Sequence, residues 1–333
     1  MFAALDLGTN NCRLIVAKPD GADYAVEETF SRSVRLGEGL WSHGKIQADA
    51  EERTILALKE CAERLEKYDI IRKRFVATEA CRMAENSDTF LHNVAEATGL
   101  KLKIISRQEE ARLATMACTS LLDRGYDRAL LFDIGGGSTE MVWLNLHSGI
   151  YKKGGFWLPE IIAWKSLPKG VVLLAEEFAK NNHTEEFYQH IVRETYAEIK
   201  EFYANIRNTD TKNWKSFHLV GTSGTVTTLA ALSLGLKKYN RFAVDGIWMH
   251  DEMLLDLIKK VRHQGKSLDV AQNFVGMERA DLLVPGCAIL QAMTEFFPHI
   301  KLRVADRGIR EGIMMELMIA HLQRKTPQKK KKH

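Results

Sequence analysis

The first third of the chain alternates between short apolar runs and helical spacings of apolar residues. The apolar runs predict strands over residues 2–7 and 12–18, and a more alternating run predicts a third strand over 24–34. Apolar residues three and four positions apart predict a helix over 49–68. The same patterns predict strands at 74–78 and 102–105 and helices at 87–98 and 108–122. Because strands and helices alternate, we expect an α/β fold with a parallel or mixed sheet.

The opening pattern begins again at residue 129. The segment ALDLGTNN at 4–11 is matched by LFDIGGGS at 131–138, so that Asp133 follows Asp6 at an offset of 127 residues. In both copies an apolar strand ends in an Asp, enters a turn and continues into a second apolar strand, at 14–17 and 141–146. We interpret this as an internal duplication. It predicts two similar domains, at 1–123 and 124–304.

The second half continues with the same mixture of elements. Helices are expected at 169–179, 185–205, 249–262 and 278–297, and strands at 217–220 and 303–305. A helix running to Gly235 should follow the turn at 221–225. We expect a closing helix, near 306–323, to pack back on the first domain. The basic segment 325–333 is predicted to be a disordered tail.

Composition narrows the class of protein. The chain has 333 residues, of which 45% are hydrophobic and 27% charged, as in ordinary globular proteins. The net charge of +4 comes from four tail lysines, Lys329 to Lys332, so no basic body suited to nucleic acid is expected. Five cysteines without a CxxC pair argue against disulfides and zinc. With no apolar run of membrane-spanning length and no signal peptide, we expect a cytoplasmic protein without a membrane segment.

The duplicated turns carry the first candidate chemistry. Glycines allow backbone N–H groups to approach and surround a phosphate, and a carboxylate at a strand end can hold a divalent metal. Two facing turns would clamp a polyphosphate, whereas the alternative is a pair of tight hairpin turns with a capping Asp. The candidate metal ligands are Asp6 and Asp133. The candidate phosphate-binding residues are Gly8, Thr9, Asn10, Gly135, Gly136, Gly137 and Ser138.

A third small-residue turn lies between a predicted strand and a helix N-terminus. Its candidate phosphate-binding residues are Gly221, Ser223, Gly224 and Thr225. Helix capping explains the same residues equally well. Glu109 and Glu110 open the helix at 108–122, and taken alone they are explained by the helix dipole.

Seven segments together resemble one family. They are residues 4–14, 34–39, 77–82, 104–113, 133–140, 221–228 and 305–312, which are similar, in the family's order, to the motifs of the exopolyphosphatase/guanosine pentaphosphate phosphohydrolase (Ppx/GppA) family. The resemblance implies two actin-like (ribonuclease H-like) domains with an interdomain cleft. It also implies magnesium- or manganese-dependent hydrolysis of terminal phosphoanhydrides of inorganic polyphosphate, of guanosine pentaphosphate, or of both.

The resemblance assigns roles to residues that are otherwise ambiguous. It places the catalytic Glu at Glu110, further metal or water-orienting acids at Asp133 and Glu140, and phosphate ligands at Arg13 and Arg82. Two departures are Thr9, where the family usually has Ser, and a third turn with fewer glycines. Longer members carry a C-terminal helical domain; we expect this chain to lack it and therefore to act distributively on long polymers.

The sequence therefore predicts a hydrolase in which a Glu110-activated water attacks a terminal phosphate. The expected ligands are polyphosphate and guanosine pentaphosphate or tetraphosphate. The sequence does not determine whether the protein forms a homodimer. Two alternatives remain: an ATP-dependent small-molecule kinase on the same fold, and a non-catalytic guanosine alarmone-binding protein. The sequence does not rank polyphosphate against guanosine pentaphosphate.

Overall fold

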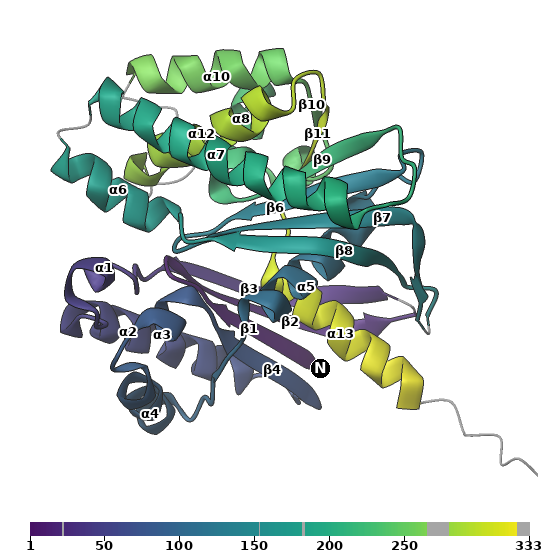
Figure 1. Ribbon diagram of the computed structural model, residues 1–333. Helices are drawn as coiled ribbons and strands as arrows, with labels where there is room; N and C mark the ends of the chain where they lie inside the picture. Colours follow the sequence, from purple (N-terminus) through teal and green to yellow (C-terminus); the bar gives the residue numbers. More distant parts are fainter. Residues whose placement is uncertain (22, 153, 182–183, 265–279, 325–333) are drawn as a thin grey trace, which may run out of the picture.

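The computed structural model describes residues 1–21, 23–152, 154–181, 184–264 and 280–324 (Figure 1). The first sheet has the strand order β3-β2-β1-β4-β5. Its first three strands pair antiparallel, and β4 and β5 continue parallel to β1. The strands are β1 (Phe2–Leu7), β2 (Asn11–Asp20), β3 (Asp23–Ser33), β4 (Arg72–Ala77) and β5 (Lys103–Ile104).

The second sheet repeats this plan. Its order is β10-β11-β9-β6-β7-β8, and β8, β7, β6, β9 and β11 have the order and directions of β3, β2, β1, β4 and β5. The short β10 is an addition at the edge of the second sheet. The predicted fold class, α/β with two actin-like halves, is confirmed. The strands are β6 (Arg128–Ile134), β7 (Thr139–Tyr151), β8 (Trp157–Leu167), β9 (Phe217–Thr222), β10 (Trp248–Met249) and β11 (Leu302–Ala305).

Helices cover the outer faces of both sheets, as Figure 1 shows. Those on the first sheet enclose a core that contains Leu5, Leu58 and Phe90, and those on the second enclose a core around Phe132 and Trp143. The first set is α1 (Leu40–His43), α2 (Ala48–Leu65), α3 (Glu79–Met83) and α4 (Ser87–Thr98). The second set is α6 (Val171–Lys180), α7 (Glu185–Thr209), α8 (Gly224–Ser233), α9 (Arg241–Val244), α10 (Asp251–Gln264) and α12 (Ala280–Phe296).

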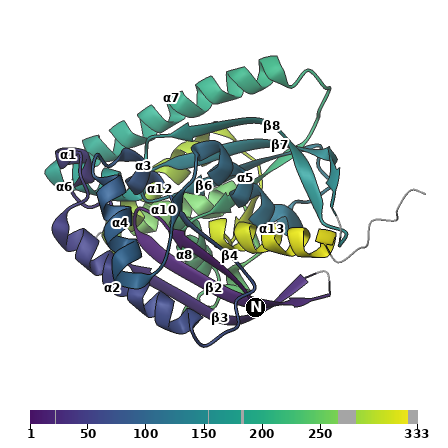
Figure 2. The same ribbon diagram turned by 90° about the horizontal axis from the view of Figure 1, so that it is seen from below.

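Two helices lie between the sheets. They are α5 (Arg107–Cys118), extended by the 3₁₀ turn η1 (Thr119–Leu121), and α13 (Ile309–Arg324), which run side by side (Figure 2). Met314 and Met318 of α13 pack with Phe2 and Ile15 of the first sheet. The closing helix thus lies against the first sheet, while α5 also packs on strands of the second.

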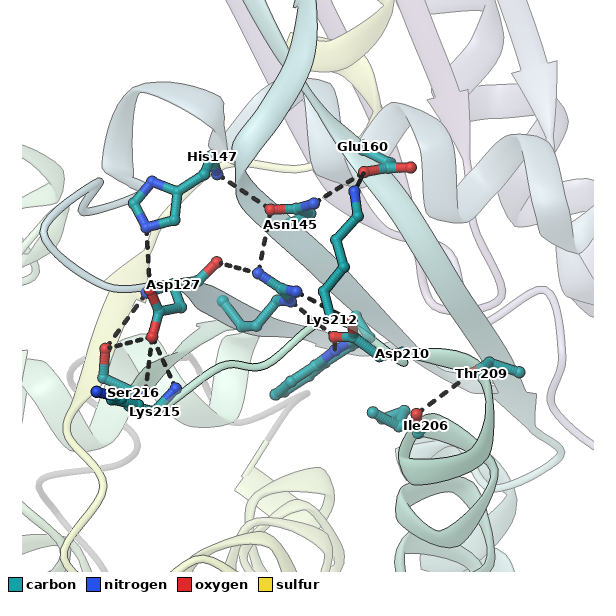
Figure 3. A network of polar contacts seen from close by, with 12 residues as sticks. Asp127, Asn145, His147, Glu160, Ile206, Thr209, Asp210, Lys212, Lys215 and Ser216 are labelled. Atoms are coloured by element: carbon teal, nitrogen blue, oxygen red, sulfur yellow. Dashed lines mark hydrogen bonds and ion pairs between the residues drawn. The ribbon is translucent and has the colours of Figure 1, made fainter.

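A buried polar network fixes the start of β6 (Figure 3). The Arg128 guanidinium donates to both carboxylate oxygens of Asp210, at 2.7 and 3.0 Å, and Trp143 Nε1 donates to the same carboxylate at 2.9 Å. Asp127 accepts backbone N–H bonds from Lys215 and Ser216. The loop after α7 is therefore tied to one end of β6, and the other end of this strand carries Asp133.

Several elements differ from the sequence prediction. Strand β8 was not predicted because Pro159 and a register shift against β7 interrupt its alternation. The other unpredicted elements, α1, α3, α9 and β10, are each five residues or shorter. Residues 278–279 of a predicted helix and the predicted disordered tail at 325–333 lie outside the described residues. Within the described ranges, no helix combines the length and the hydropathy needed to cross a bilayer.

Candidate active site

A cavity of about 480 Å³ lies between the two halves and receives both duplicated turns. Both candidate metal-binding Asp residues and Glu110 also line it. The predicted phosphate-binding residues that line it are Gly8, Thr9, Asn10, Arg13, Gly135, Gly136, Gly137, Ser138, Ser223, Gly224 and Thr225. The cavity joins distant parts of the chain: Arg310, which lines it, donates to the Phe30 carbonyl 280 positions away.

Each of the two duplicated turns is closed by an equivalent backbone hydrogen bond, and the two turns touch each other. Gly8 N–H donates to Asn11 O, and Gly135 N–H donates to Ser138 O, both at 2.9 Å. A Cβ at Gly136 would stand 3.0 Å from Thr9 Cβ, and one at Gly137 would stand 2.7 Å from Thr9 Oγ1. Neither of these glycines has a positive φ. They are required because the turns approach closely, a reason the sequence could not supply.

The structure places Glu109 and Glu110 in different environments. The Ser106 side chain caps α5 by accepting the Glu109 N–H at 3.2 Å, which puts both acids in the first turn. Hydrogen bonds from Arg112 and Arg74 lower the pKa of Glu109 to about 2. Burial raises the pKa of Glu110 to about 7; Asp6 and Glu79 add to this rise and Arg82 opposes it. Glu110 is the buried acid of the pair, and it faces the cavity.

Asp6 and Asp133 supply two further buried carboxylates. Burial raises the pKa of Asp6 to about 6 against the effect of Arg13. Burial and the Glu110 carboxylate raise the pKa of Asp133 to about 7. Asp6 Oδ1 is buried without a hydrogen-bond partner. An orphaned carboxylate oxygen beside further acids fits a hard cation, which prefers oxygen ligands.

No group of three His, Cys, Asp or Glu side chains in the described part of the chain is arranged to hold a metal ion unaided. Mg²⁺ commonly uses one or two carboxylates together with substrate phosphates and water. The pair Asp6 and Asp133 is compatible with that kind of site.

Three predicted residues do not line the cavity. Glu140 lies behind the second turn, where it accepts hydrogen bonds from Ser138 Oγ at 2.7 Å and Ser166 Oγ at 2.8 Å. Burial and the neighbouring acids hold the pKa of Glu140 well above its usual range. Gly221 lies within β9, where a Cβ would stand 2.6 Å from the Phe132 ring. Its small size serves packing in the sheet, and its role as a phosphate ligand stays a prediction.

Arg82 is the third of these residues. Its guanidinium is held by Glu79, by the Ile105 carbonyl at 2.7 Å and by Glu110 at 2.5 Å. The predicted phosphate ligand thus contacts the predicted catalytic residue. The direction of this side chain could not be predicted from the sequence, because it depends on how α3 packs against α5.

The third turn caps a helix and also lines the cavity. Ser223 Oγ caps α8 by accepting the Val226 N–H at 3.0 Å. Gly224 and Thr225 line the cavity beside it. Capping and cavity lining are therefore compatible at a strand-to-helix turn.

Sequence reasoning left several cavity residues without a role. They are Glu79, Tyr239 and the residues of the turn from Asp306 to Glu311. Burial would raise the pKa of Glu311, but Arg310 and Arg241 bring it down to about 2. The sequence signal for this turn is the motif at 305–312, although the sequence alone assigns it no role.

Comparison with known proteins decides the family. The model of the Ppx/GppA phosphatase family matches residues 14–321. The chain belongs to this family. Its members provide the frame in which the cavity, the duplicated turns and Glu110 can be understood.

Three relatives illustrate the range of Ppx/GppA proteins. A putative exopolyphosphatase of Haemophilus influenzae is 29% identical, with 95% of this chain and 91% of that protein covered. A bifunctional 3-dehydroquinate synthase/phosphatase of Fusobacterium nucleatum is also 29% identical, over 94% of this chain and 46% of that protein. A guanosine-5′-triphosphate,3′-diphosphate pyrophosphatase of Photobacterium profundum is 27% identical, over 96% and 59%. The chain thus spans about half the length of two of these relatives.

Solved structures agree with the Ppx/GppA assignment. The crystal structure of the Aquifex aeolicus family member has a TM-score of 0.75 and 28% identity, covering 96% of this chain and 98% of that one. An exopolyphosphatase-like protein has a TM-score of 0.80 and 26% identity, covering 95% and 97%. The similarity extends over both halves of the molecule.

Proposed function

We propose that this protein hydrolyses the terminal phosphoanhydride of inorganic polyphosphate, of guanosine pentaphosphate, or of both. The observation that carries the proposal is Glu110, a buried carboxylate with a pKa of about 7 that faces a cavity lined by two small-residue turns. The names of the Haemophilus and Photobacterium relatives support this substrate class. Hydrolysis is helped by a base near the phosphorus atom, and Glu110 would provide it.

The residues of the chain divide the work of such a reaction. The turns at Gly8–Asn10 and Gly135–Ser138, with Arg13, would bind and orient the terminal phosphoryl group. Glu110 would accept the proton of the attacking water as that water forms a bond to phosphorus and the bridging oxygen departs. A base with a pKa close to the working pH is favoured for proton transfer. Arg82 would keep the Glu110 carboxylate in place through its 2.5 Å contact.

We propose magnesium, or manganese, as the cofactor. Asp6 and Asp133 would hold it together with substrate oxygens, and Glu140 would support the site by fixing Ser138. When bound, the cation supplies positive charge that offsets the negative charge of the phosphates. This role fits the burial of Asp133 and its repulsion by Glu110, which together raise the pKa of Asp133.

The two alternative functions make different demands on the site. A kinase needs a base directed at a substrate hydroxyl, and a pure binding protein gains nothing from a buried carboxylate beside a phosphate site. Membership in a phosphatase family favours hydrolysis over both. All five cysteines are free, and we propose a reducing, cytoplasmic location on this basis.

One set of turnover assays distinguishes these functions. The protein is incubated with guanosine pentaphosphate, with short and long polyphosphate, and with ATP plus a panel of sugars. We expect phosphate release from the first two substrate types and no sugar phosphorylation. Phosphate transfer to a sugar would establish the kinase, and tight binding of guanosine pentaphosphate without turnover would establish the binding protein.

A further inference from the structure

Helices α3 and α5 are joined by a chain of four charged side chains. Arg107 donates from Nε to Glu79 Oε2 at 3.1 Å and from Nη2 to Glu79 Oε1. Glu79 Oε2 accepts from Arg82 Nε at 2.8 Å, and Arg82 Nη2 donates to Glu110 Oε2 at 2.5 Å. We call this the Arg107–Glu79–Arg82–Glu110 chain.

The spacing of these residues explains why the chain forms. Glu79 and Arg82 stand three residues apart on α3, and Arg107 and Glu110 stand three residues apart on α5. Residues three apart share one face of a helix. Each helix thus presents one negatively charged and one positively charged side chain to the other, in the order that lets unlike charges meet.

Burial makes this chain different from a surface ion pair. The Glu79 side chain is 3% exposed and that of Glu110 is 9% exposed, whereas Arg107 at the outer end is 40% exposed. Removing one partner of a buried ion pair leaves the other charge uncompensated. Without Glu79, the Arg82 guanidinium would lose the acceptor of its Nε.

The Arg82 guanidinium contacts two cavity-lining acids, Glu79 and Glu110, in this arrangement. Each of its nitrogens is engaged, by Glu79, by the Ile105 carbonyl and by Glu110, and it does not line the cavity. Because Arg82 contacts Glu110 directly, a shift of the Arg82 guanidinium would also shift the Glu110 carboxylate.

We propose that Glu79 and Arg107 are positioning residues for Glu110, acting through Arg82. Glu79 fixes the plane and direction of the Arg82 guanidinium, and that guanidinium fixes the carboxylate that activates water. Arg107 holds Glu79 from the other side. This inference rests on the proposed role of Glu110 as the base.

The variants Glu79→Gln and Arg107→Met test the inference. We expect kcat to fall by roughly 10- to 100-fold in Glu79→Gln, and by less in Arg107→Met, because a base displaced by about 1 Å can cost about 100-fold. KM should not rise and the affinity for inorganic phosphate, measured by calorimetry, should not weaken, because Glu79→Gln removes a negative charge from the cavity wall. Arg107→Lys keeps the charge and one bond, so it should recover part of the activity lost in Arg107→Met.

A matched control separates positioning from general loss of stability. Arg112 lies on the same helix with a side-chain exposure of 36%, and its partners are Glu109 and Glu316. Arg112→Met should lower the melting temperature at least as much as Arg107→Met while leaving kcat unchanged. A parallel fall of kcat in both variants would overturn the inference, because the effect would then follow stability alone.

A double-mutant cycle gives the second test. In a Glu110→Gln background, Glu79→Gln should cause no further loss of kcat, because both changes act on the same group. A further loss together with weaker phosphate binding would overturn the inference and place Arg82 on the substrate. Full activity of Glu110→Gln alone would instead refute the proposed function, so the two failures are distinguishable.

Discussion

Asp6 and Asp133 face one cavity from equivalent positions in the duplicated halves. Across the hairpins, Asp6 is paired with Arg13 and Asp133 with Glu140, so position 13 of the first copy corresponds to position 140 of the second. The duplication has kept the two acids and reversed the charge of their neighbours. Arg13 lines the cavity, whereas Glu140 is buried behind it. Two buried acids that share one cavity favour the binding of a cation.

The first prediction concerns metal binding and stability. The pKa values of Asp6 and Asp133 are raised to about 6 and about 7, so their contribution to stability is complete below pH 4 and is lost as the pH rises through those values. Mg²⁺ should therefore raise the melting temperature more at pH 8 than at pH 5.5. Saturation to 100 times Kd is worth about 2.7 kcal/mol.

Asp133→Asn is the variant for this prediction. It should reduce the Mg²⁺-dependent rise in melting temperature and abolish Mg²⁺-dependent turnover, while the metal-free protein becomes more stable at pH 8. An equal rise in both proteins, or full activity in excess chelator, would remove Asp133 from the metal site.

The second prediction concerns the pH dependence of turnover. Glu110 acts as a base only when ionised, and burial raises its pKa to about 7. The value of kcat/KM should therefore fall about tenfold for each pH unit below about 7 and level off above it. Mg²⁺ bound nearby lowers the pKa of an adjacent carboxyl, so the fall in kcat at saturating metal should begin at lower pH. A kcat/KM that is constant from pH 5.5 to 8 would contradict the assignment.

The third prediction concerns stability away from the site. Asp210→Ala leaves the buried Arg128 guanidinium without its partner and should destabilise the protein by about 3–5 kcal/mol. Breaking the more exposed pair of Lys165 and Glu201 should cost about 0.2–1 kcal/mol. Denaturant titration measures both changes. The kcat of folded Asp210→Ala should stay normal, and a selective loss of kcat would show that this end of β6 influences the cavity.

The sequence was most informative where structure is set locally. The repeat at offset 127 predicted both hairpins and the equivalence of Asp6 and Asp133, because a strand, a turn and a second strand form from neighbouring residues. The third strand of the second half, β8, was not predicted, because Pro159 interrupts its pattern. The predicted helix at 87–98 matches α4, which ends at Gly99 in a left-handed conformation.

The sequence was least informative where a side chain depends on packing between helices. Arg82 is predicted as a phosphate ligand and Glu140 as a metal ligand, but neither lines the cavity, and Glu140 is buried behind the second turn. The direction of Arg82 is set by the Arg107–Glu79–Arg82–Glu110 chain, whose members come from two helices. Gly221 was expected in a phosphate turn because of its sequence neighbours, whereas the Phe132 ring across the sheet is what requires a glycine there.

The fourth prediction is that Glu110→Gln removes the base and preserves binding. The substitution keeps the size of the side chain and its contact with Arg82. Loss of general base catalysis should lower kcat by roughly 10²–10⁴, which is about 3–5 kcal/mol of barrier. Substrate affinity should hold or improve, since one negative charge beside the polyphosphate is gone.

Glu109→Gln provides the control within the same helical turn. Its carboxylate is bound by Arg74 and Arg112 on the side of α5 that faces away from the cavity. This change should cost some stability and leave kcat near normal.

The most direct test is the rate of phosphate release from guanosine pentaphosphate and from short polyphosphate by the wild type, Glu110→Gln and Glu109→Gln. The account predicts a loss of roughly 10²–10⁴ in kcat for Glu110→Gln alone. Near-normal kcat in Glu110→Gln, or equal losses in the two variants, would contradict the assignment of Glu110 as the group that activates water.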